Sequence, residues 1–194
     1  DLTNKQSERQ HLHKVWHDVQ SVLGLQTETY RFPVNLSLEL PSLDIEAFPD
    51  FGCYIFKCPS VYIAIRCLTG SVGKNTSHFH EDQLSLDLEI NGNSAITDPG
   101  TAVYTPIPSK RNQFRSQKAH FVPDCGHESG LTQKTNVFCP LRIRPATLKY
   151  FGTAGFAAEV IGRDHSTGIF LTFEVDAVEV VHFCTGDATL KRKS

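Results

Sequence analysis

The chain has 194 residues, of which 40% are hydrophobic and 21% charged, a composition typical of about one globular domain. A formal net charge of −2 argues against nonspecific binding to nucleic acid. No apolar stretch approaches the ~18 residues that indicate a membrane span. The chain begins at Asp1 and contains no methionine, so both excision from a longer protein and loss of a leader are open.

Residues 3–23 are expected to form an amphipathic helix, with Gly24 as a natural stop. Its apolar residues recur at helical spacing: Leu12, Val15, Trp16, Val19, Val22 and Leu23. Three histidines are assigned to the solvated side of this helix: His11, His13 and His17. The stretch from 31 to 50 is interpreted as an extended connector, because it is broken up by Pro33, Pro41 and Pro49.

Short apolar segments then alternate with turn residues, which favours an antiparallel sandwich. Strands are predicted at 53–57, 61–68, 83–91, 93–97, 119–122, 135–144, 157–161, 169–175 and 178–184. The expected fold is mainly β, a two-layer antiparallel β-sandwich of large sheets with a short N-terminal helix. Residues 1–44 are assigned to the helix and connector, and residues 45–194 to the sandwich domain.

The clearest local signal is a β-hairpin. From Leu84 to Ile90 apolar residues alternate with polar ones, which is typical of a half-buried strand. Asn91-Gly92 suits a type I′ turn, because both central residues of that turn need a positive φ. The return strand ends before Asp98-Pro99-Gly100. Alternation extended backwards would put His78, His80 and Asp82 on the face of the leucines.

The hairpin should bring Asp98 back to the level of His80. Two imidazoles, a carboxylate and an open position suit a zinc ion that keeps a bound water. His120, further along the chain, is a third candidate imidazole. The alternative is two ordinary polar residues at a sheet edge, since short motifs often match by chance.

A cupin metal motif also contains His-x-His. That motif requires a glutamate four or five residues after the second histidine, and Leu84 and Ser85 occupy those positions here. The cupin assignment therefore ranks low.

Four motifs, in this order, resemble the heparinase II/III-like family of polysaccharide lyases, which includes heparin/heparan lyases and related alginate lyases. They are residues 78–85 (His-Phe-His-Glu-Asp-Gln-Leu-Ser), Asn91-Gly92, residues 98–104 (Asp-Pro-Gly-Thr-Ala-Val-Tyr), and Phe114-Arg115-Ser116 leading to Ala119-His120. Residues 48–52 (Phe-Pro-Asp-Phe-Gly) resemble the usual entry to the same domain. The resemblance covers roughly residues 45–185. Phe79 and Phe121 depart from the family pattern.

The resemblance implies one zinc ion bound by His80, Asp98 and His120. It implies that His78 faces the substrate cleft, and that Tyr104 is a second catalytic candidate. The implied reaction is β-elimination on an anionic uronic-acid polysaccharide. The family's helical toroid domain, which carries the main base/acid tyrosine, is missing from this sequence. A periplasmic or secreted location is implied as well.

A polyanionic substrate would need a local basic patch. Arg115 is the preferred substrate-binding candidate, because it lies in the Phe-Arg-Ser motif. Lys110 and Arg111 are interpreted as parts of a solvated loop.

The six cysteines lack metal-type spacing, so buried free thiols are the default expectation: Cys53, Cys58, Cys67, Cys125, Cys139 and Cys184. A disulfide would suit an exported lyase, but no pairing follows from the sequence.

Two function classes stay open. One is the catalytic part of a lyase, and the other is a carbohydrate-binding or structural sandwich that zinc stabilises without chemistry. His78 and Tyr104 favour the first class. The lack of a complete set of catalytic acids and bases favours the second for this chain alone.

Overall fold

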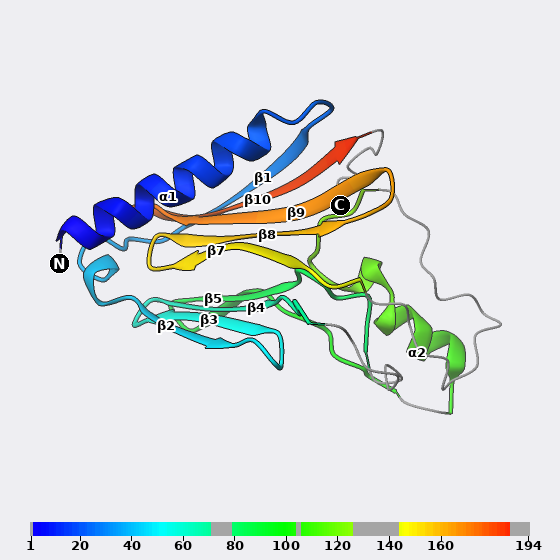
Figure 1. Cartoon of the computed structure of the whole chain (residues 1–194). Coiled ribbons are helices and arrows are strands. Elements are labelled where there is room, and N and C mark those ends of the chain that lie inside the picture. The colour runs from blue at the N-terminus through cyan, green and yellow to red at the C-terminus, as the bar shows by residue number, and fades with distance from the viewer. Residues whose placement is uncertain (1, 71–78, 104–105, 126–143, 187–194) are drawn as a thin grey trace.

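Two antiparallel five-stranded sheets, A and B, pack face to face in this computed structural model, which describes residues 2–70, 79–103, 106–125 and 144–186. Sheet A consists of β1 (Gln26–Pro33), β7 (Thr147–Gly152), β8 (Gly155–Ile161), β9 (His165–Phe173) and β10 (Ala177–Gly186). Sheet B consists of β2 (Asp44–Phe48), β3 (Cys53–Cys58), β4 (Val61–Arg66), β5 (Leu86–Ile90) and β6 (Asn93–Ile96). Their strand orders are β1-β10-β9-β8-β7 and β2-β3-β4-β5-β6 (Figure 1). The prediction of an antiparallel sandwich is confirmed.

The core between the sheets is built from the inward-facing residues of both. Phe56 and Ile63 of sheet B and Phe156 and Leu171 of sheet A are fully buried there. The Phe56 ring packs against that of Phe173 of sheet A, with 5.1 Å between the ring centroids. Such aromatic contacts across the layers bury large areas and fix the distance between the two sheets.

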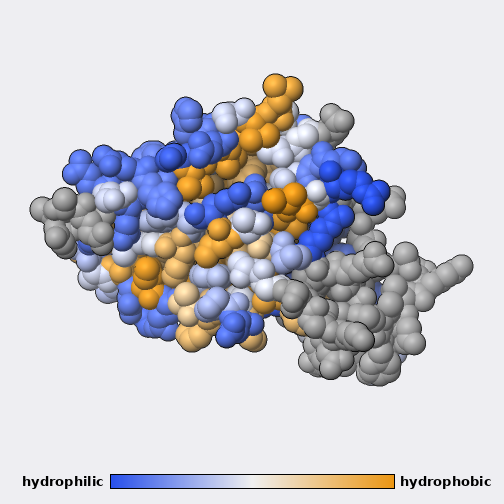
Figure 2. Space-filling model, viewed as in Figure 1, coloured by the Kyte–Doolittle hydropathy of each residue, from blue (hydrophilic) through white to orange (hydrophobic). Residues whose placement is uncertain are grey.

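The helix α1 (Leu2–Gln20) covers the outer face of sheet A (Figure 1). Leu12 is 3% exposed, and the Trp16 ring stacks on Phe170 with 4.7 Å between centroids. The opposite side of the helix is polar, as the blue surface over it shows (Figure 2). The three histidines assigned to that side are exposed, as predicted. The helix ends at Gln20, three residues before the expected end, and Gly24 follows with a φ of +74°.

The prediction that residues 31–50 form an extended connector is wrong where this stretch contains the end of β1 and all of β2. All of β1 pairs with β10, from Gln26↔Cys184 to Pro33↔Ala177, so the sandwich includes residues before position 45. Pro33 is compatible with this strand because it is the last residue of an edge strand, where proline is tolerated. β2 is likewise an edge strand, and it pairs with β3. Pro33 and Pro49 therefore mark the ends of β1 and β2, whereas Pro41 lies in a 3₁₀ turn (Leu40–Ser42) between them.

Other boundaries also differ from the prediction. β7 was not predicted, although its Thr-Leu-Lys-Tyr-Phe-Gly sequence alternates partly buried and exposed positions near its start. The predicted strand at 119–122 is absent from the described structure, because a 3₁₀ turn (Gln117–Ala119) and irregular backbone occupy that segment. The predicted strand at 135–144 lies outside the described residues except for Arg144. A helix, α2 (Pro108–Arg115), replaces the expected solvated loop.

No helix among the described ranges has both the length and the apolar character needed to cross a membrane.

Candidate functional site

The predicted hairpin forms the framework of the candidate site. Asn91 and Gly92 have φ values of +51° and +73°, as the turn requires, and Ile90 pairs with Asn93 across it. A register shift occurs between Leu88 and Glu89. Strand β6 then leads directly into the Asp98-Pro99-Gly100 turn, so Asp98 is held beside strand β5.

The backward extension of strand β5 does not occur. β5 begins at Leu86, and a turn closes before it, in which the Ser85 backbone N–H donates to the Asp82 carbonyl at 2.9 Å. Leu84 has a φ of +66° and is fully buried. This left-handed residue breaks the two-residue period, so the alternation that placed His80 and Asp82 on one strand face is wrong. His78, the third residue of that prediction, lies outside the described residues.

The structure nevertheless brings His80, Asp98 and His120 together, and we call these three residues the histidine–aspartate cluster. Asp98 Oδ2 and His120 Nδ1 are 2.5 Å apart, and the rings of His80 and His120 have centroids 5.3 Å apart. His80 is 9% exposed and His120 is 2% exposed. Each residue comes from a different segment: the turn before β5, the end of β6 and the segment after the 3₁₀ turn.

Hydrogen bonds fix the position of Asp98. Its backbone N–H donates to Asp87 Oδ1 of β5 at 2.5 Å, and its own Oδ1 accepts from the Gly100 N–H at 2.9 Å. Burial alone would raise the pKa of Asp98, but the hydrogen bonds from His120 and Gly100 outweigh burial and hold the pKa below its usual value. Asp98 is therefore a carboxylate, held on its own hairpin and aimed at His120.

His80 is a neutral imidazole at neutral pH. Burial, followed by the electrostatic effect of His120, lowers the pKa of His80 to about 4. Its Nε2 lies 3.4 Å from the Thr101 hydroxyl, at the upper limit for a hydrogen bond. A neutral imidazole is the form that binds a metal ion.

Asp82 is a further acidic group beside the cluster, and the sequence reasoning assigned it no role. Its Oδ1 lies 4.0 Å from Nε of Arg66, and its side chain is 23% exposed. Burial raises the pKa of Asp82, an effect that Arg66 and then His120 oppose. Asp82 lies within the motif that carries the family resemblance, but nothing in the sequence pointed to Arg66 as its neighbour.

Arg115 supports the backbone of the His80 segment. Its side chain is 2% exposed, and its Nε donates to the Phe79 carbonyl at 3.0 Å. The Glu81 N–H donates to the Arg115 carbonyl at 2.8 Å. Lys110 is exposed as expected, but Arg111 is only 6% exposed, so its assignment to a solvated loop is wrong. The reason is that α2 turns Arg111 and Arg115 to the same side, four residues apart.

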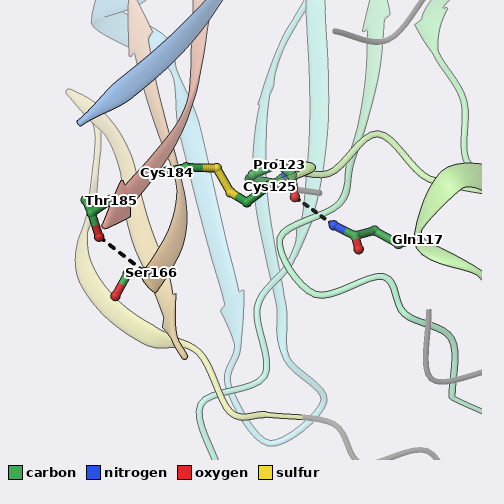
Figure 3. Close-up of a disulfide and its surroundings, with 6 residues drawn as sticks. All are labelled: Gln117, Pro123, Cys125, Ser166, Cys184 and Thr185. Carbon is green, nitrogen blue, oxygen red and sulfur yellow. Dashed lines mark hydrogen bonds between the residues drawn. A yellow bond between two sulfur atoms is a disulfide. The ribbon is translucent and has the colours of Figure 1, made fainter. Parts of the chain in front are cut away.

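A disulfide between Cys125 and Cys184 anchors the segment that follows His120 to β10 (Figure 3). The Cα atoms are 6.0 Å apart, a usual distance for a disulfide. The expectation of free thiols is therefore wrong for these two cysteines. Three of the described cysteines are free, Cys53, Cys58 and Cys67, whereas Cys139 lies outside the described residues.

Phe121 provides a second anchor for the same segment. Its ring lies 4.8 Å from Tyr30 and 4.6 Å from His182, centroid to centroid. These two partners belong to β1 and β10 of sheet A. Phe121, one of the two departures from the family pattern, therefore packs on sheet A.

The cluster has the right chemistry for zinc. Two imidazoles and one carboxylate are a common donor set, and the neutral His80 is ready to act as a ligand. Across the described ranges, no three histidine, cysteine or acidic side chains are already arranged around a common point for a metal ion. The direct contact between Asp98 and His120 occupies atoms that could serve as ligands. An ion would have to separate these two side chains, or take the place of the proton between them.

His78 and Tyr104, the catalytic candidates from the sequence, both lie outside the described residues. The structure therefore assembles the predicted metal ligands but does not describe the predicted catalytic pair.

Comparison with protein families gives one match. Residues 40–122 match the family described as heparinase II/III-like, C-terminal. The matched segment includes strands β2 to β6, helix α2 and all three residues of the histidine–aspartate cluster. No curated protein matches the chain.

Proposed function

We propose that this chain is the β-sandwich part of a polysaccharide lyase, because residues 40–122 match the heparinase II/III-like, C-terminal family. The proposed substrate is an anionic uronic-acid polysaccharide, and the proposed reaction is β-elimination. The observation that carries the proposal is the convergence of His80, Asp98 and His120 from three separate segments of the matched region. Burying polar side chains costs free energy, so the meeting of three such residues from distant segments in a buried place indicates a functional site.

β-Elimination breaks the C–H bond next to the uronate carboxylate and the bond to the glycosidic oxygen, and it forms a C=C bond. A base takes the proton, an acid protonates the leaving oxygen, and positive charge must neutralise the carboxylate. We assign His78 and Tyr104 to the proton-transfer and cleft roles. Arg115 is proposed to contribute positive charge toward the substrate.

We further propose that His80, Asp98 and His120 bind one zinc ion. Bound zinc would supply a fixed positive charge and tie the end of the hairpin to the His120 segment. The residues themselves are already held in place, Asp98 by Asp87 and the His120 segment by the disulfide to β10. Such support of the ligands is what a metal site of defined geometry requires.

The proposal includes an N-terminal helical domain of the same protein, which would complete the cleft. The 194-residue chain alone is then expected to have little or no lyase activity. A periplasmic or secreted location is part of the proposal, and the Cys125–Cys184 disulfide supports it, because disulfides persist in oxidising compartments.

The test is metal analysis of the purified chain, followed by ultraviolet absorbance assays of the parent protein on heparin, heparan and alginate. We expect about one zinc per chain, and we expect His80→Ala to lose both the metal and the activity. His78→Ala should lose activity but keep the metal. His17→Ala is the matched control, because it removes an exposed histidine of α1. Zinc below roughly a tenth of an equivalent after zinc addition would contradict the metal site.

The second candidate is a carbohydrate-binding or structural module without catalysis. The burial of Arg115 favours this candidate, because the guanidinium expected to meet the substrate supports the Phe79 backbone instead. Full zinc content in a parent protein that shows no turnover on any uronic-acid polymer would select this second function.

A further inference from the structure

The turn between β2 and β3 presents an exposed aromatic ring on a rigid support. Phe51 is 72% exposed, although the backbone of its turn is well fixed. The Gly52 N–H donates to the Phe48 carbonyl at 2.8 Å, and the Cys67 N–H donates to the Gly52 carbonyl at 2.8 Å. Gly52 has a φ of +71°, and a Cβ there would meet the Leu68 Cα at 2.8 Å. The fold therefore fixes the turn without using the Phe51 ring in the core.

A positive charge lies directly beneath this ring. The guanidinium carbon of Arg66 is 5.7 Å from the centroid of Phe51 and 5.3 Å from that of Phe79. Arg66 Nη1 also donates to the Phe51 carbonyl, so one side chain fixes both the backbone and the ring. These distances are those of cation–π contacts. Arg66 keeps 18% of its side chain exposed.

The same three residues adjoin the histidine–aspartate cluster. Phe79 is the residue immediately before His80, and its carbonyl is held by Arg115. Arg66 Nε lies 4.0 Å from Asp82 Oδ1, within the turn that connects His80 to β5. The exposed ring therefore lies at the margin of the candidate site rather than on a remote surface.

The neighbouring surface is open and partly apolar. Phe48 is 48% exposed, and it pairs across the sheet with Cys53, which in turn pairs with Arg66. This row of outward-facing side chains lies at the end of sheet B that leads to the cluster. An extended chain lying along the row could contact both phenylalanines and the guanidinium.

We propose that Phe51 and Arg66 form a sugar-binding subsite beside the histidine–aspartate cluster, which receives one anionic pyranose ring of a uronic-acid polysaccharide. The C–H face of the sugar stacks on the Phe51 ring. Its carboxylate or sulfate lies toward the Arg66 charge. The subsite rests on the proposed function for its ligand class, but it adds binding residues outside the predicted site.

The experiment is calorimetric titration of the chain with alginate-derived and heparin-derived oligosaccharides, and with a neutral glucose oligosaccharide. Phe51→Ala should weaken binding of the anionic sugars about tenfold, which is the loss of one good stacking contact. Phe51→Trp should retain binding, because it keeps an aromatic face. Arg66→Gln should weaken binding and reduce its dependence on salt.

Leu38→Ala is the matched control, because it removes an apolar side chain that is 89% exposed on another loop. Thermal melting of each variant checks folding, and the Phe51 variants should melt as the wild type does. Arg66→Gln also loses the hydrogen bond to the Phe51 carbonyl. If that variant unfolds, the comparison of Phe51→Ala with Phe51→Trp decides the test.

Equal affinity of wild type and Phe51→Ala for every anionic sugar would overturn the subsite. The subsite would also be overturned if the wild-type chain bound none of the anionic sugars, or if it bound the neutral sugar equally well. The proposed function fails by a different readout, namely the metal content of the chain and the lyase activity of the parent protein. Loss of the subsite with zinc and activity intact would leave the proposed function standing.

Discussion

The two sheets of the sandwich differ in how many of their faces are buried. In β10 of sheet A, consecutive residues such as Val180 and Val181 are both buried, at 0% and 6% exposure. In β4 of sheet B, buried Ile63 follows Tyr62, which is 39% exposed. Sheet A is enclosed between sheet B and helix α1, whereas the outer face of sheet B meets solvent (Figure 1). The alternation in β4 and its absence in β10 follow directly from this difference.

The two sheets therefore have different roles in the candidate site. Sheet A provides fixed anchors, including Cys184 for the disulfide and His182 for the ring of Phe121. Sheet B and its loops carry Asp87, Arg66 and Asp98, which face the candidate site. A polar side chain on the outer face of sheet B does not interrupt the core between the two sheets. Polar groups can therefore gather on this face at little cost to stability.

The largest effect is expected in the core that the two sheets share. Phe56→Ala should lower the free energy of unfolding by about 3–5 kcal/mol, because Phe56 of sheet B is fully buried against the rings of Phe151 and Phe173 of sheet A. Urea denaturation gives the value. Phe51→Ala is the matched control on the open side of sheet B, and it should change stability by less than ~0.5 kcal/mol. Similar losses for the two variants would contradict the division into buried and open faces.

The second effect tests the anchor on sheet A. The disulfide joins residues 59 positions apart, and removing such a link typically costs about 2–4 kcal/mol. Cys184→Ser should therefore lower the denaturation midpoint, and added reductant should lower that of the wild type but not of the variant. Cys58→Ser, which changes a free and partly buried cysteine, is the control. A wild-type midpoint that does not respond to reductant would show that the bond contributes nothing to stability.

The third effect tests the cover on the outer face of sheet A. Trp16→Ala removes the ring that stacks on Phe170 and touches Phe183, and it should cost about 2–3 kcal/mol, because Trp16 is only partly buried. His17→Ala, on the exposed side of the same helix, should have little effect. Equal effects of the two variants would mean that α1 contributes no packing energy to the sheet. Denaturation followed by tyrosine fluorescence keeps the readout independent of the lost tryptophan.

The sequence predicted the elements whose causes are local. The helix was predicted from the spacing of its apolar residues and the hairpin from Asn91-Gly92, because each signal lies within a few residues. β1 was missed because its stability comes from pairing with β10, which is distant in the sequence, and β2 was missed because the prolines on either side of it were taken as marks of a connector. A proline at the end of an edge strand looks the same in sequence as a proline in a connector.

The site was predictable through its motif more than through geometry. The three residues that the motif grouped lie together in the structure, but the strand alternation used to align His80 was wrong, since Leu84 adopts a positive φ. The disulfide was not predictable, because pairing depends on the packing of Cys125 against β10. The burial of Arg111 and Arg115 depends on helix α2. The polar sequence of this helix and the two prolines at its start did not predict a helix.

The smallest effect concerns one carboxylate that ties α1 to sheet A. Glu8 Oε2 accepts hydrogen bonds from the Thr153 N–H at 2.8 Å, from the Thr153 hydroxyl at 2.7 Å and from the Tyr150 hydroxyl at 3.3 Å. Glu8→Ala leaves these partly buried donors without that acceptor, so it should cost about 1–2 kcal/mol in urea denaturation. Glu8→Gln keeps an acceptor oxygen, and it should recover at least half of that loss. Glu89→Ala, an exposed carboxylate on the open face of sheet B, is the control and should be nearly neutral. If Glu8→Gln were as destabilising as Glu8→Ala, the negative charge rather than the acceptor geometry would hold the helix. If Glu8→Ala were as mild as Glu89→Ala, the helix would be held by its apolar face alone, through Leu12 and Trp16.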